Sequence, residues 1–204
     1  NYDTDTARIW VYNTWWFEAI MLLFVLNFIG NIKRFQLLKR KNWAVLVLHL
    51  AWIFIIIGAG ITRYISDEGT LSLREGETTD SYLSDRTYIT AMVDGIFEGQ
   101  PLRKKQQKEV LFSVHTQNHY HWASDFKGKP FEIKYISFSA PTQGMNALTL
   151  EISSGGERQQ VTVMGHKGMV HPPVTIKINQ LDFHLSYGSI YVAMPFSIKL
   201  NDFI

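Results

Sequence analysis

The chain has 204 residues, a net charge of +2, no cysteine, and a composition that is 46% hydrophobic and 14% aromatic. A charge this close to zero gives no reason to expect a nucleic-acid-binding protein. The lack of cysteine excludes disulfides, thiolate metal sites and a cysteine nucleophile. Residues 14–62 are far more apolar than the rest, whereas six of the seven histidines lie beyond position 63. The composition therefore predicts two regions of different character.

Two apolar runs in the first region are long enough to cross a bilayer. They cover residues 14–32 and 43–62, and about 20 helical residues span a hydrocarbon core of about 30 Å. Residues 1–13 precede them and are acidic and aromatic, which argues against a signal peptide and favours an arm at the membrane interface. Because the chain begins with asparagine, we expect it to be a piece of a longer protein.

The link between the two runs predicts their orientation. Residues 33–42 contain five lysines and arginines, and short loops of this kind stay in the cytoplasm. Both outer ends of the helical pair then lie on the far side of the membrane. Residues 63–204 are therefore expected in the periplasm or outside the cell.

Residues 63–204 carry the pattern of an all-β domain. Short segments rich in β-branched and aromatic residues recur between turn-forming stretches, and SGGE at 154–157 is the clearest hairpin signal. We expect an antiparallel sandwich or open barrel that is incomplete at its C-terminus. The expected strands are residues 70–75, 87–93, 109–115 and 131–139, the two runs that flank SGGE, and further strands within 173–187 and 194–204.

His49 lies inside the second apolar run. An imidazole is costly in a bilayer and generally marks a functional path, although it can also serve as a hydrogen-bonding contact between helices. His49 lies six residues after Trp43, and Asn27 lies six residues before Lys33. An antiparallel pair would place both at the same depth, about 9 Å from the cytoplasmic end. Asn27 could then hold one imidazole nitrogen and leave the other free, as around metal-ligating histidines.

The second apolar run has two different faces. Ala51, Gly58 and Thr62 form a stripe of small residues, through which we expect close helix packing. His49 points away from this stripe. Its own face could receive a flat hydrophobic ligand, or it could contact another helix that is missing from this chain.

Other polar groups allow simpler interpretations. Arg63 could extend toward Glu18 and form an ion pair at the outer end of the helices. His119 and His121 have a spacing that can bind metal in an extended segment, but a solvated strand face is favoured. The basic segment 98–109 is expected to be a solvated loop, with membrane lipid or a partner protein as possible contacts.

Several motifs together resemble one known family, the ResB (CcsB) component of system II cytochrome c biogenesis. The resemblance covers residues 14–79 and 194–203 and is strongest to versions in which ResB precedes a CcsA half in one chain. The motifs are Trp16-Phe17, Leu26-Asn27, RKNWAVLVLHL (40–50), GAGITRY (58–64), EGTLSLREGET (68–78) and MPFSIKLNDF (194–203).

This resemblance implies that haem b is carried across the bacterial inner membrane to the periplasm. There the CcsA half or subunit attaches it to the CxxCH motif of apocytochrome c. A transmembrane histidine of the family serves as an axial haem ligand, and His49 matches that position. The chain lacks the tryptophan-rich motif of CcsA. We therefore expect no catalytic residue in it, no activity of the chain alone, and no metal site other than the haem iron at His49.

Two other functions stay open. In the first, a membrane-tethered periplasmic β domain only binds protein, and His49 is a packing residue that tolerates glutamine. In the second, His119 and His121 hold the metal of a metalloenzyme.

Overall fold

The computed structural model describes residues 4–141 and 144–203. These residues fall into two compact units, one formed by residues 7–67 and the other by residues 68 onward together with the first residues of the chain. The segment predicted as an interfacial arm forms a short helix α1 (Thr4–Ala7) and a π-helical turn η1 (Arg8–Tyr12), with residues 1–3 outside the described part.

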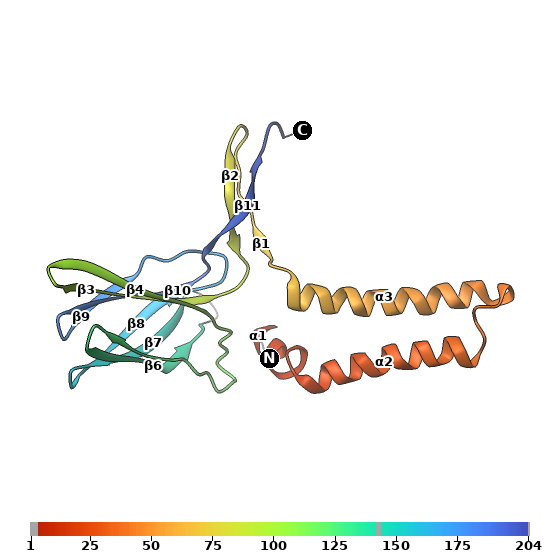
Figure 1. The fold of residues 1–204 in the computed structure, drawn as a ribbon, viewed down its shortest axis with the longest axis horizontal. Coiled ribbons are helices and arrows are strands. Elements are labelled where there is room, and N and C mark those ends of the chain that lie inside the picture. The colour runs from red at the N-terminus through yellow and green to blue at the C-terminus, as the bar shows by residue number, and fades with distance from the viewer. Residues whose placement is uncertain (1–3, 142–143, 204) are drawn as a thin grey trace. The chain divides into compact units, whose positions relative to one another are not determined.

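Two long apolar helices make up most of the first unit. Helix α2 covers Trp15–Arg34 and α3 covers Trp43–Ile65, with a 3-10 turn η2 (Arg40–Asn42) before α3. Both are long and apolar enough to cross a membrane. They lie side by side and run in opposite directions (Figure 1). The helical part of the predicted fold is confirmed.

The end of α2 follows from its local sequence. Gln36 adopts a left-handed conformation with φ of 52°, and its N–H donates to the carbonyl of Lys33 at 3.2 Å. The N–H of Leu37 donates to the carbonyl of Ile32 at 3.0 Å, which completes a Schellman motif. Lys33 and Arg34 lie in the last turn, where positive charge is favoured by the helix dipole.

The second unit consists of antiparallel strands. Two four-stranded sheets, ordered β4-β3-β10-β9 and β5-β6-β7-β8, enclose a shared core, and a three-stranded sheet β1-β2-β11 extends from them (Figure 1). An antiparallel sandwich is thus confirmed. The strands are β1 (Gly69–Thr70), β2 (Thr78–Ser84), β3 (Tyr88–Phe97), β4 (Gln100–Glu109), β5 (His121–Phe126), β6 (Lys129–Ser139), β7 (Asn146–Ser154), β8 (Glu157–Gly165), β9 (Val174–Ile178), β10 (Leu181–Gly188) and β11 (Tyr191–Lys199).

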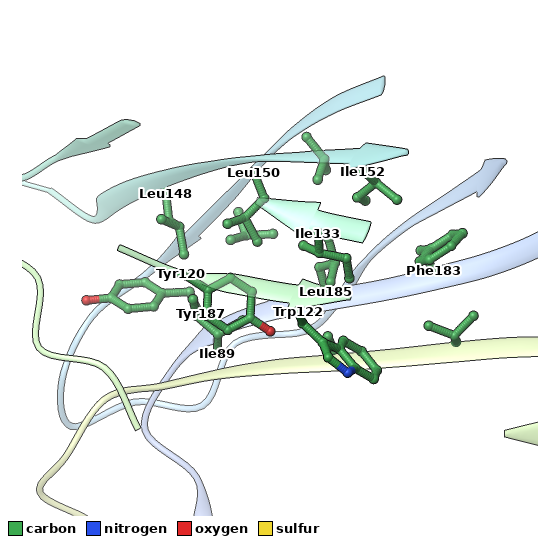
Figure 2. Close-up of a cluster of buried hydrophobic side chains, with 14 of the residues drawn as sticks. Ile89, Tyr120, Trp122, Ile133, Leu148, Leu150, Ile152, Phe183, Leu185 and Tyr187 are labelled. Carbon is green, nitrogen blue, oxygen red and sulfur yellow. The ribbon is translucent and has the colours of Figure 1, made fainter. Parts of the chain in front are cut away.

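Inward-facing side chains of both four-stranded sheets form one hydrophobic core (Figure 2). Every second residue of β7 is buried, and Leu148, Leu150 and Ile152 are fully enclosed. Phe183 of β10 packs edge-to-face on Phe131 of β6, with ring centroids 5.5 Å apart. Because these two residues come from different sheets, the core joins both layers.

Several strand predictions were wrong or incomplete. Within 70–75 only Thr70 is in a strand, and 109–115 leaves the sheet after Glu109. Segment 98–109, expected to be a solvated loop, supplies β4, while β2 and β5 were not predicted. β4 is exposed along almost its whole length, so it lacks the alternation that marks a strand, and pairing with β3 holds it in the sheet. Charged side chains are typical of such an edge strand.

Candidate functional site

The packing of α2 on α3 determines where His49 lies. The less exposed residues of α3 recur at intervals of three and four, the spacing typical of two helices that pack along a seam. His49 is one of them, and its ring contacts Phe28 of α2 with centroids 5.5 Å apart. The α3 residues of this seam are Leu46, His49, Ile53, Ile56, Gly60 and Arg63, whereas Gly58 is half-buried but does not follow this spacing.

The small-residue stripe on the other side of α3 is not the contact surface of this pair. Ala51 and Thr62, the two ends of the stripe, are exposed, whereas Gly58 between them is half-buried. The prediction of packing through the stripe is therefore wrong for α2. The larger side chains of Leu46 and Ile53 fill the interface instead, and both are buried. The His49 face was expected to meet a ligand or a helix from outside this chain, but it meets α2 instead.

The imidazole of His49 is held by its own helix. Nδ1 lies 2.8 Å from the carbonyl oxygen of Val45, one turn earlier. A carbonyl oxygen only accepts, so Nδ1 carries a proton, and in the neutral imidazole Nε2 then presents a lone pair. Within the part of the chain that the structure describes, no hydrogen bond is made to Nε2. A hydrogen bond on one nitrogen that leaves the other as a donor ligand is the arrangement found around metal-binding histidines.

Asn27 lies next in sequence to Phe28, so it is close to the depth of His49, as predicted. Its side-chain oxygen accepts a hydrogen bond of 2.9 Å from Asn31, one turn further along α2, and the side chain is exposed. The Val45 carbonyl takes the place beside Nδ1 that was considered for Asn27. A supporting role for Asn27 stays a prediction.

Phe28, the aromatic ring that contacts the imidazole, itself stacks on two further rings. Trp52 stacks on Phe28 with centroids 6.4 Å apart and planes 8° from parallel, and Phe24 stacks on Phe28 at 6.5 Å. Trp52 stays 49% exposed. His49 itself is half-buried. A neutral nitrogen beside flat apolar surface can bind the metal of an apolar macrocycle.

The predicted ion pair between Glu18 and Arg63 is confirmed. Their side chains approach to 2.7 Å, and Arg63 also donates to the carbonyl of Tyr12. One guanidinium therefore connects α3 to the start of α2 and to the turn η1 before it. The pair is partly exposed, and pairs of this kind contribute about 1 kcal/mol or less.

His119 and His121 do not form the metal site considered for them. His119 is exposed, whereas Nε2 of His121 lies 2.6 Å from a carboxylate oxygen of Glu132. Lys134 pairs with the same carboxylate at 2.8 Å. The hydrogen bond from Lys134, followed by that from His121, lowers the pKa of Glu132. Among the described residues no group of three or more His, Asp or Glu side chains could hold a metal.

Sequence reasoning missed a contact between two other histidines. Nδ1 of His166 is 3.1 Å from Nε2 of His171. Burial, and then the charge of His166, lower the pKa of His171. The repeated histidine in GHKGMVH was the available signal, although spacing alone does not show that two rings meet.

Comparison with known proteins gives one informative result. No model of a known protein family matches the chain. The chain is similar to Protein NrfI of Wolinella succinogenes, with 26% identity over 206 aligned residues. The alignment covers 100% of this chain and 22% of NrfI, so the chain spans about a fifth of that relative's length. The similarity therefore includes both the helical unit and the β unit, and it links this chain to part of a longer protein.

Proposed function

We propose that the chain is part of the machinery of cytochrome c biogenesis and helps to carry haem across the membrane. The similarity to Protein NrfI over the whole chain supports the pathway. The resemblance of its motifs to ResB supports the finer role. The observation that carries the proposal is the state of His49, whose Nδ1 is bonded to Val45 while Nε2 keeps a lone pair.

His49 is assigned as an axial ligand to haem b, which is cargo rather than a resident group. The Val45 carbonyl orients the ring and fixes its tautomer, so Nε2 is the atom that binds iron. Phe28 supplies an aromatic ring in contact with His49, and Trp52 stacks on Phe28. His49 is only half-buried in the seam, which leaves part of its side chain open to haem.

The rest of the path lies outside this chain. We assign a second haem ligand and the attachment step to a CcsA half or subunit, with apocytochrome c as the acceptor. The basic residues between α2 and α3 support a cytoplasmic link, and hence an inner-membrane protein with its β domain in the periplasm. His49 then lies in the cytoplasmic half of the membrane, on the side from which haem enters.

The proposal is tested by visible absorption spectra of the full-length parent protein purified from membranes. We expect His49→Ala to lose most of the bound haem and to recover a low-spin spectrum when imidazole is added. His49→Gln should also lose haem, because an amide can replace the hydrogen bond to Val45 but not the iron ligand. His119→Ala, which removes an exposed histidine of the β unit, serves as the matched control.

The alternative function gives the opposite result. If the chain is only a tethered protein-binding scaffold, His49→Gln keeps the haem content and spectrum of the wild type. Equal loss of haem in His49→Ala and His119→Ala would also contradict the assignment, because it would reflect general damage rather than loss of a ligand.

A further inference from the structure

The β unit contains a pair of imidazoles that is separate from the membrane histidine. His166 directly follows β8, and His171 lies five residues later in the loop that leads to β9. Nδ1 of His166 and Nε2 of His171 are 3.1 Å apart, the ring centroids are 5.3 Å apart, and the rings are tilted by 51°. Both side chains are half-buried, so solvent reaches the space between them.

We propose that His166 and His171 together chelate a divalent first-row metal ion. Metal–nitrogen bonds of about 2.0–2.1 Å place two neighbouring ligand atoms about 2.9 Å apart at a right angle and about 3.4 Å apart at a tetrahedral angle. The observed separation of 3.1 Å lies between these limits. The two nitrogens are thus already at the separation that two ligands of one metal ion require. Imidazole suits Cu²⁺, Ni²⁺ and Zn²⁺, and Cu²⁺ binds most tightly of these.

The loop between the two histidines is fixed by hydrogen bonds to the chain after β10. The N–H of Ser189 donates to the carbonyl of Met169 at 3.0 Å, and its hydroxyl accepts from the N–H of Gly168 at 2.9 Å. The same hydroxyl donates to the carbonyl of Arg86 at 3.0 Å. Ser189 is buried, so these bonds are shielded from water. A ligand pair on such a loop is ordered before the metal arrives, which favours binding.

Two glycines leave room for the ring of His171. A methyl group at Gly165 would lie 3.2 Å from Cδ2 of His171 and 1.9 Å from the carbonyl oxygen of Tyr187. A methyl group at Gly188 would lie 3.1 Å from the same Cδ2, and Gly188 has a φ of 142°. The ring therefore sits against bare backbone on two strands. A side chain at either position would press on this ring and would clash with the backbone of Tyr187 or Met169.

The protein supplies two ligands to this site. No third His, Asp or Glu joins the pair among the described residues, and nearby Lys167 pairs with Asp85 at 2.7 Å. Water, or a donor from another molecule, completes the coordination. On binding, the proton that lies between the rings moves to the outer nitrogen of the same imidazole, because both facing nitrogens must present lone pairs to the metal. We expect an exchangeable site rather than a permanently closed structural one.

The test uses the detergent-purified chain without a histidine tag, stripped of metal by a chelator and titrated with CuCl₂. We expect electron paramagnetic resonance to show Cu²⁺ coupled to two imidazole nitrogens, with a saturable site in equilibrium dialysis. His166→Asn and His171→Asn should each weaken binding about tenfold or more, a loss of about 1.4 kcal/mol or more by the standard conversion. His119→Asn is the matched control and should bind copper as the wild type does.

A second measurement does not depend on the variants folding. In the unmodified chain, substoichiometric Cu²⁺ should broaden the imidazole NMR signals of His166 and His171 before those of His119 and His121. The proposal is wrong if the double variant His166→Asn/His171→Asn binds copper as tightly as the wild type. It is equally wrong if the first signals to broaden belong to other histidines.

Discussion

The tautomer of His49 is fixed by one backbone carbonyl, and this fact also limits what Asn27 can contribute. Since Val45 already holds Nδ1, we expect Asn27→Leu to weaken haem retention by about tenfold at most, the lower range for removal of a supporting group. His49→Ala should have a larger effect. Haem content per purified parent protein measures both. A loss from Asn27→Leu as large as that from His49→Ala would show that Asn27 holds the ligand directly.

Counting residues along two helices was enough to place some side chains at the same depth. The contact of Phe28 with His49 and the pair of Glu18 with Arg63 both follow from a constant rise per residue in an antiparallel pair. The hydrogen bond between Nδ1 of His49 and the carbonyl of Val45 depends on the rotamer of His49. The His166–His171 pair depends on how a loop closes on a distant strand. Neither is encoded in local spacing, so neither was predicted.

The seam between α2 and α3 makes a prediction about two isoleucines of one helix. Ile53 is 9% exposed in the seam, whereas Ile55 is 60% exposed on the outside. We expect Ile53→Ala to destabilise the helix pair by about 1–2 kcal/mol, because its packing contacts are lost. Ile55→Ala should change the stability of the helix pair by only a small fraction of this amount. Thermal unfolding in detergent, followed by helical circular dichroism, compares them, and equal effects would place the seam elsewhere.

Elements with a clear polar and apolar alternation were predictable, and those without it were not. β7 and β8 bury every second residue over much of their length and are joined by Gly155 and Gly156, both with positive φ. β4 is polar on both faces, so its sequence predicts a loop. The face of α3 that meets α2 is hard to predict for a related reason. Most residues on every side of α3 are apolar, so periodicity gives no preference for the side that meets α2.

At the scale of the whole molecule, the two compact units should lose structure separately. Phe183 is fully buried in the β core. We expect Phe183→Ala to lower the stability of the β unit by about 3–5 kcal/mol, the usual cost of a large cavity, while the helices keep their signal. Circular dichroism at helix and strand wavelengths during urea unfolding measures this. A common midpoint for both signals would show that the units are thermodynamically coupled.

The order of the strands has a consequence for how the β unit forms during synthesis. Most neighbouring strands are joined by short turns and can pair as soon as they emerge, but β3 also pairs with β10, with Tyr88 opposite Gly188. Until β10 has emerged, the hairpin of β3 and β4 exposes its inner edge and the buried side of Val93. Late closure of this kind slows folding and exposes the chain to misassembly. The lysines and the arginine of β4 disfavour wrong strand pairing only at the outer edge of the hairpin. The nascent chain is therefore most exposed to wrong pairing along the inner edge, which β3 forms.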